Sequence, residues 1–198
     1  MLRPAQLQAT AAPTPYAPPA TSGAIAAWPD VHLVANGMAV HLRMIAPGDL
    51  EREREFVHGL SPRTRYQRLM SARTPSAEEL RRWTDVDRSR EGAVVATVDI
   101  DGFERQVGVA RYFIDQPDAQ ADFAIVVADE WQGMGLGRQL LTALVDLARQ
   151  SGVRKLVGTT MSENKGMIAL GRSFGFRPSR EPGAAIYTLL SLSLQPEC

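Results

Sequence analysis

Three glycines stand where an apolar run, typical of a buried strand, gives way to an amphipathic run, typical of a helix. The stretch Glu130 to Arg138 reads EWQGMGLGR and follows the strand-like run 121–127 (ADFAIVV). After it, leucines recur at helical spacing over 136–150, so this helix is expected to pack one face on a sheet. The first N–H groups of a helix have no partner within it, and glycines lack the Cβ atoms that would keep an anion away from them. The loop therefore predicts a phosphate-type binding site at the edge of a sheet.

A simpler explanation of the loop is a tight turn, for which one glycine is often enough. Three alternating glycines flanked by Gln132 and Arg138 favour ligand binding over that alternative. The dinucleotide fingerprint GxGxxG is absent, because Arg138 and Leu140 stand where its third glycine would be. The Walker pattern is excluded too, since the sequence contains no Gly-Lys-Ser or Gly-Lys-Thr.

The order of the predicted segments indicates an α+β fold, with a mixed sheet covered by helices. Strands are expected at 38–44, 93–100, 106–114, 121–127, 155–160 and 185–192. Helices are expected after Pro47, twice between Pro62 and about Val86, and at 136–150 and 164–174. The charged run 51–55 (ERERE) is interpreted as a solvated helix face with local charge pairs. Residues 1–30 are rich in proline and alanine and are expected to form a disordered tail, which leaves one domain at 31–198.

The composition is balanced and gives no sign of a charged macromolecular partner. Lysine plus arginine and aspartate plus glutamate both number 22, so neither nucleic acid nor an anionic membrane is expected as a partner. No apolar run reaches the roughly 18 residues of a transmembrane helix. The one cysteine, Cys198, excludes a disulfide framework, and the scattered His32, His41 and His58 do not indicate a metal site. We therefore expect a cytoplasmic protein without a metal, in which any acidic ligand is held by a local site.

The loop follows the pattern Gln-x-x-Gly-x-Gly over residues 132–137, and a second pattern accompanies it near the C-terminal end. Asn164 is followed eleven residues later by Gly175-Phe176. Together, these patterns resemble the GNAT superfamily of N-acetyltransferases over about residues 36–194, and the loop resembles the acyl-CoA loop of that superfamily. The resemblance implies the GNAT acyl-CoA N-acyltransferase fold, a mostly antiparallel mixed sheet flanked by helices. It also implies acetyl-CoA as the cofactor and coenzyme A as the product.

Three longer stretches are similar to the catalytic domain of bacterial protein lysine acetyltransferases of the Pat type. They are 60–68 (LSPRTRYQR), 87–91 (DRSRE) and 121–127 running into Trp131-Gln132-Gly133. This similarity implies transfer of acetyl to the ε-amine of protein lysines, by direct attack of the amine on the thioester. It also implies cofactor contacts from Val126, Val127, Gln132, Gly133, Met134, Gly135, Leu136, Gly137, Arg138 and Asn164.

The similarity also suggests how the acceptor amine loses its proton. A lysine amine, with a pKa near 10.4, is almost wholly protonated at neutral pH, so a general base is useful. In Pat-type domains a glutamate on the strand before the loop has this role, and Asp122 stands at the matching position, one methylene shorter and therefore expected to act through a bridging water. Glu130 is a reserve candidate. The tyrosine that protonates the leaving thiolate in many GNAT enzymes falls on Gly171, so that acid is missing, as it is in Pat-type proteins.

Two other functions remain open at this point. The acceptor could be a small amine such as a polyamine, an amino acid or an antibiotic, with the same chemistry. The chain could instead be a non-catalytic acyl-CoA-binding sensor or interaction module, because Asp122 replaces the glutamate and the tyrosine is absent. A monomer and a homodimer are both compatible with the sequence.

Overall fold

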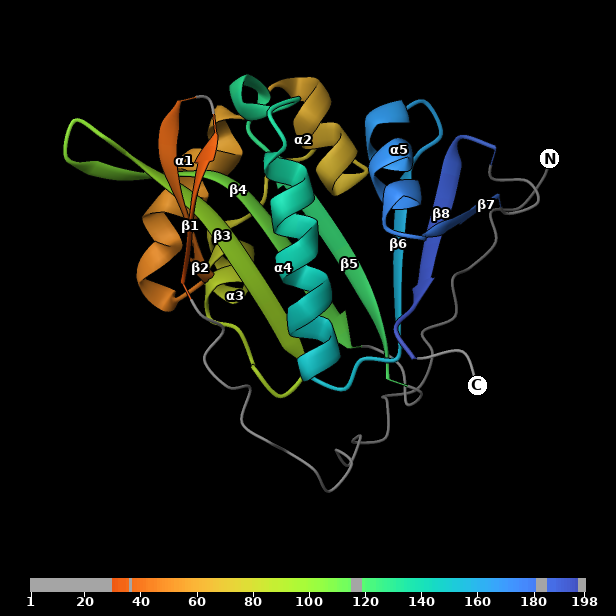
Figure 1. The fold of residues 1–198 in the computed structure, drawn as a ribbon. Helices are drawn as coiled ribbons and strands as arrows, with labels where there is room; N and C mark the ends of the chain where they lie inside the picture. Colours follow the sequence, from red (N-terminus) through yellow and green to blue (C-terminus); the bar gives the residue numbers. More distant parts are fainter. Residues whose placement is uncertain (1–29, 36, 115–118, 181–184, 196–198) are drawn as a thin grey trace.

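The computed structural model describes residues 30–35, 37–114, 119–180 and 185–195, which form one sheet with helices on both faces (Figure 1). The strands are β1 (Val31–Ala35), β2 (Met38–Met44), β3 (Glu91–Ile100), β4 (Phe103–Ile114), β5 (Gln120–Val127), β6 (Lys155–Met161), β7 (Arg177–Ser179) and β8 (Tyr187–Ser193). The helices are α1 (Leu50–Gly59), α2 (Pro62–Leu69), α3 (Ala77–Thr84), α4 (Leu136–Gln150) and α5 (Lys165–Ser173), with short 3-10 helices η1 (Pro47–Asp49) and η2 (Asp129–Trp131). Apart from Asp30, the predicted tail at 1–30 lies outside the described residues.

The strands follow the order β1-β2-β3-β4-β5-β6-β8-β7, and every neighbouring pair is antiparallel except β5 and β6. The prediction of a mixed, mostly antiparallel sheet is therefore confirmed. Each of the six predicted strands is present. Strands β1 and β7, which lie at the two edges of the sheet, were not predicted. Within the described part of the chain, no helix combines the length and the apolar character needed to span a membrane.

Strand β3 lies between two helical layers, and its residues are buried along most of its length for that reason. Val94 and Ala96 belong to the core that packs against α4, whereas Ala93 and Val95 belong to the core under α1 and α3. Successive residues of a strand point to opposite faces, so a run without polar alternation is expected only where both faces are covered. The sheet is therefore the middle layer of three.

Helix α4 is held on the sheet by the stripe of leucines that the sequence predicted. Leu140, Leu141, Leu144 and Leu147 are each fully buried. At Gly108 of β4 an added Cβ would lie 2.8 Å from Leu140 Cδ1, so the absence of a side chain there lets the helix approach the sheet closely. This packing fixes the N-terminus of α4 and the glycine loop at the end of β5.

The two parallel strands diverge after a short contact. Only Gln120 to Asp122 of β5 pair with β6, opposite Lys155 to Val157. Figure 1 shows the strands converging at one end and separating toward the end where α2 and α5 lie. At the start of the split the Phe123 ring lies against Gly158, where an added Cβ would come within 2.6 Å of it. The divergence opens a gap in the sheet between β5 and β6.

The interpretation of 51–55 as a solvated helix face is wrong for one residue. Glu53 of α1 is 1% exposed and faces the sheet, while its neighbours Glu51 and Glu55 are exposed. The expected local pair does form between Glu51 and Arg54, three residues apart.

Candidate active site

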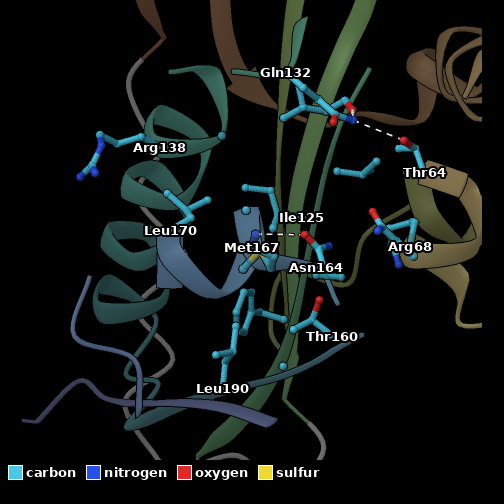
Figure 2. A pocket seen from close by; sticks show the side chains of 18 of the residues that line it. Thr64, Arg68, Ile125, Gln132, Arg138, Thr160, Asn164, Met167, Leu170 and Leu190 are labelled. Atoms are coloured by element: carbon cyan, nitrogen blue, oxygen red, sulfur yellow. Dashed lines mark hydrogen bonds between the residues drawn. The ribbon is translucent and has the colours of Figure 1, made fainter. Parts of the chain in front are cut away.

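A cavity of about 440 Å³ lies between the diverging strands β5 and β6 (Figure 2). Its walls come from β5, β6, α2, α5 and the glycine loop. Of the predicted cofactor contacts, those that line it are Val126, Val127, Gln132, Gly133, Gly135, Gly137, Arg138 and Asn164. The structure thus brings together residues as far apart in the sequence as Val126 and Asn164.

The glycine loop leaves open space around its backbone. Gly133 and Gly135 adopt positive φ values of 77° and 86°, and an added Cβ on either would meet no described atom within 4 Å. Gly135 is the N-cap of α4 and provides no side-chain cap for the first N–H groups of the helix. Neither the buried Leu136 side chain nor the exposed Met134 side chain lines the cavity, so these two can contribute only backbone groups. This arrangement fits the pyrophosphate of an acyl-CoA.

The edge of β5 provides the second element of the cofactor fit. Beyond Asp122 no residue of β5 pairs with β6 within the described chain, although β5 continues to Val127. Apart from the Val127 carbonyl oxygen, which accepts from the Gln132 side chain, the backbone polar groups on that edge are therefore available to an extended ligand, which can lie along the strand as an added strand would. An amide-bearing arm such as pantetheine suits this edge, with its pyrophosphate directed to the loop.

A hydrogen-bond network fastens the loop to α2. The Gln132 side chain donates through Nε2 to the Val127 carbonyl oxygen at 3.0 Å and to Thr64 Oγ1 at 3.3 Å (Figure 2). Asp129, just before the loop, accepts from Ser61 N–H at 2.9 Å, from Ser61 Oγ at 2.7 Å and from Thr64 Oγ1 at 2.6 Å. Burial raises the pKa of Asp129, but the hydrogen bonds from Thr64 and Ser61 lower it below its ordinary value overall. An ionised Asp129 thus holds the start of α2 beside the loop.

The side of the cavity opposite β5 is formed by α5 and the start of α4. Asn164 caps α5, because its Oδ1 accepts from the Met167 N–H at 3.0 Å, and the same side chain lines the cavity (Figure 2). Arg138 donates to Ser173 Oγ at 3.1 Å, and its guanidinium carbon lies 5.4 Å from the centroid of the Phe174 ring. These contacts hold a positive charge near the glycine loop.

Both candidate bases lie outside the lining of the cavity. Asp122 is exposed on β5 and is the last residue of that strand to pair with β6, opposite Val157. The alternation of the strand puts it on the same face as Ala124 and Val126, which do line the cavity. Glu130 is exposed in η2.

Gly171 packs closely against its neighbours on α5. An added Cβ would lie 3.2 Å from Leu190 Cδ1, so the position that corresponds to the GNAT tyrosine has no room for a large side chain. Ser173, two residues on, donates through Oγ to the Leu170 carbonyl oxygen at 2.7 Å.

The α2 wall was not predicted to belong to the site. Thr64, Gln67 and Arg68 all line the cavity. The stretch 60–68 resembles Pat-type domains, but it carries no spacing that identifies a ligand-binding role. The usable signal was Ser61-Pro62, which predicts where α2 begins; that Ser61 caps it through a contact with the Thr64 N–H is visible only in the structure.

Comparison with known proteins gives a family match over most of the domain. The sequence model of the acetyltransferase (GNAT) family matches residues 58–176. The chain is 34% identical over 165 residues to acetyltransferase PA5475 of Pseudomonas aeruginosa, covering 83% of this chain and 89% of that protein. It is 30% identical over 135 residues to acetyltransferase Pat of Mycolicibacterium smegmatis, covering 68% of this chain but only 40% of the length of Pat.

Solved structures share the fold. The GNAT domain of S. lividans PAT superposes with a TM-score of 0.73 at 24% identity, covering 83% of this chain and 96% of that domain. The structure of yncA from Salmonella typhimurium with its cofactor acetyl-CoA gives a TM-score of 0.64 at 20% identity, covering 80% of this chain and 96% of that one. At 24% and 20% identity, the similarity to these two structures shows a shared fold and nothing beyond it.

Proposed function

The chain belongs to the acetyltransferase (GNAT) family, and we propose on that basis that it acetylates the ε-amine of protein lysines by direct attack of the amine on the thioester. As a family member it is an acetyl-CoA-dependent acetyltransferase with an amine as acceptor. The cofactor supplies an activated acetyl thioester, and the residues of this chain bind it, orient it and accept the proton of the amine.

The observation that carries the proposal is the joint geometry of the split strands and the glycine loop. The unpaired edge of β5 is suited to hold the pantetheine arm through the backbone of Val126 and Val127. The open backbone from Gln132 to Arg138 is suited to hold the pyrophosphate, and Asn164 lies across the cavity to contact the lower arm. Holding the two reactants in contact supplies much of the rate of such a transfer.

A protein lysine is the acceptor that the resemblance favours. Its support is the 30% identity to acetyltransferase Pat together with the Pat-type stretches at 60–68 and 87–91. The matched part is 40% of the length of Pat, so the proposal concerns the catalytic domain alone.

We assign the role of general base to Asp122, acting through a water molecule. It stands where β5 and β6 separate, is exposed, and directly precedes the run 123–127, which lines the cavity. Because its side chain does not line the cavity, a relay by water is needed to reach the amine.

The test measures release of free thiol from acetyl-CoA with a panel of lysine-bearing proteins and small amines. We compare the wild type with Asp122→Asn, and use Asp146→Asn on the exposed side of α4 as a control with the same change of charge. Loss of a general base should lower kcat by about 10²- to 10⁴-fold. The control should keep full activity, and the affinity for acetyl-CoA should be unchanged in both variants.

Other results would replace the proposal. Turnover with small amines only would make the chain a small-molecule acetyltransferase. Acetyl-CoA binding without thiol release for any acceptor would favour a sensor. Full activity of Asp122→Asn would contradict the assignment of the base and leave the family chemistry intact.

A further inference from the structure

Of the described residues that line the cavity, the charged ones are two arginines, Arg68 and Arg138. Figure 2 shows them on opposite sides of the cavity, Arg138 beside the N-terminal end of α4 and Arg68 on α2. Arg138 lies next to the glycine loop, where an anionic cofactor group is expected. Binding of that anionic group by Arg138 does not explain the positive charge of Arg68 on the opposite side of the cavity.

Arg68 is held in place by an aromatic ring. Its guanidinium carbon lies 5.5 Å from the centroid of the Trp83 ring of α3, and that of Arg111 lies 5.4 Å from the same centroid. Arg111 also donates to the Trp83 carbonyl oxygen at 3.1 Å. Stacking on a fixed ring restricts the guanidinium without using its N–H donors.

The carboxylate nearest to this pair is already engaged. Glu53 accepts from Arg111 Nη2 at 3.3 Å through one oxygen and from the Gln106 amide through the other. Arg68 takes part in none of the ion pairs formed among the described residues. The group Arg68, Arg111 and Glu53 therefore carries one excess positive charge in the wall of the cavity.

Burial makes this charge costly. Burial lowers the pKa of Arg68 to about 10, the like charge of Arg111 lowers it as well, and only Glu53 acts in the opposite direction. Arg68 remains a cation at neutral pH. A partly buried guanidinium with unused donors that faces a cavity is a strong binding site for a planar anion such as a carboxylate.

The position of Arg68 on α2 relates its guanidinium to the part of the cavity where the acceptor is expected. Thr64, one turn earlier on α2, is the residue that contacts Gln132 of the loop, so Arg68 lies one turn farther along the helix. Its neighbour Arg111 of β4 is directly opposite Ala124 of β5, two residues from Asp122. The excess charge therefore lies toward the part of β5 that carries the proposed base.

We propose that Arg68 determines acceptor specificity by binding a carboxylate that the acceptor carries close to its reactive amine. The inference rests on the proposed function in that it concerns the amine that Asp122 would deprotonate. In a protein acceptor, the carboxylate belongs to an acidic side chain next to the lysine. In a free amino acid, it is the α-carboxylate, and both sources present the same planar group to the guanidinium.

The experiment uses two peptides that differ only in having glutamate or glutamine beside one lysine, and a free amino acid with its carboxamide. For the wild type, kcat/KM for the glutamate peptide should exceed that for the glutamine peptide by about 10- to 100-fold, the usual effect of a charge-assisted hydrogen bond. Arg68→Gln should remove this preference and leave the KM for acetyl-CoA unchanged. Arg63→Gln is the matched control, since Arg63 is exposed on the same helix, does not line the cavity, and should keep the preference.

A second variant separates recognition from a purely structural role of Arg68. Arg68→Glu should reverse the preference, so that a lysine flanked by arginine becomes the better acceptor. If Arg68→Glu instead slowed the reaction of all acceptors equally, the substitution would only perturb packing, and this result would contradict the proposal. Should Arg68→Gln fold poorly, Arg68→Lys keeps the charge without the planar fork and should retain part of the preference.

The outcomes distinguish this inference from the proposed function. Equal kcat/KM for both peptides in the wild type would overturn the role of Arg68 and leave protein lysine acetylation intact. Turnover of the free amino acid but not of its carboxamide or of either peptide would support Arg68 and overturn a protein acceptor. If no acceptor is turned over, the inference is tested by the affinities of the two peptides, measured by fluorescence anisotropy with coenzyme A present. Equal affinity for the two peptides would then overturn the inference.

Discussion

Helix α1 takes part in two ion clusters that differ in their balance of charge. The closed cluster joins Arg43, Asp49, Arg52 and Glu104, and each arginine contacts both carboxylates at 2.7 to 2.9 Å. The open cluster joins Arg68, Arg111 and Glu53, and its only ion pair is that of Arg111 with Glu53 at 3.3 Å. Both contain a carboxylate that is almost fully buried, Asp49 in one and Glu53 in the other.

The difference follows from what each cluster adjoins. The closed cluster joins β2, the start of α1 and the β3–β4 hairpin, and none of its members lines the cavity. Two positive and two negative charges there satisfy one another. The open cluster has one carboxylate for two arginines and reaches the cavity through Arg68. An uncompensated buried charge destabilises the fold, so it is expected in a binding site, where a ligand supplies the opposite charge, and not in a cluster that only supports the fold.

The largest effect is expected in the open cluster. Glu53→Ala should lower the free energy of unfolding by about 3–5 kcal/mol, because it removes the only carboxylate that forms an ion pair with Arg111 among the described residues and that offsets the charge of Arg68. Urea unfolding measures the loss. Glu55→Ala is the control, since Glu55 lies on the exposed side of the same helix with only Arg105 at 3.9 Å. A loss below about 1 kcal/mol for Glu53→Ala would show that the open cluster is compensated by solvent.

A smaller loss is expected from the closed cluster. Asp49→Ala removes the acceptor of Arg43, Arg52 and the Ala46 N–H, yet both arginines keep Glu104. We expect a decrease of about 2 kcal/mol in the free energy of unfolding, again from urea unfolding. A loss as large as that of Glu53→Ala would remove the distinction between the clusters.

The sequence was sufficient for the parts of the molecule that local pattern determines. The leucine stripe of α4 and the glycines before it predicted both the helix and the loop, because helical spacing and missing Cβ atoms have direct structural consequences. Strands β1 and β7 were missed. The burial of the first alternates along the strand, but its outward-facing Val34 is apolar and hides the alternation in the sequence, and the second has only three residues.

The clusters show why the α2 wall and the buried carboxylates could not be predicted. In the run ERERE all three glutamates look alike, and only the packing of α1 on the sheet makes Glu53 the buried one. Arg68 likewise becomes part of a site through contacts with Trp83, fifteen positions away, and through the neighbouring Arg111 of β4. Such long-range pairings leave no spacing signal in a single sequence.

The pH dependence of stability sharpens the comparison further. Burial raises the pKa of Asp49, but the hydrogen bond from Arg43, the Ala46 N–H and the charge of Arg52 lower it below the ordinary 3.8 overall. Because the folded-state pKa is depressed, this stabilisation is present above pH 3.8 and is lost as the pH falls through the folded-state value. Urea unfolding at pH values lowered stepwise below 3.8 should therefore show a steeper loss of the free energy of unfolding for the wild type than for Asp49→Asn. Parallel curves would mean that Asp49 does not contribute to acid sensitivity.

The smallest effect is expected from a third ion pair on the same helix, which tests whether burial causes the difference. Glu51 and Arg54 pair three residues apart, but their side chains are 66% and 53% exposed. Water screens the two charges, and holding both side chains in one geometry costs entropy, so Arg54→Ala should change the free energy of unfolding by less than about 0.5 kcal/mol. The three carboxylates Asp49, Glu51 and Glu53 lie within five positions of one another. If the loss in the free energy of unfolding is largest for Glu53, smaller for Asp49 and smallest for the Glu51 pair, it follows burial and the number of partners that remain. A loss from Arg54→Ala as large as that from Asp49→Ala would show that the charges of α1 act through helix stability, and the contrast between the open and the closed cluster would then have no energetic basis.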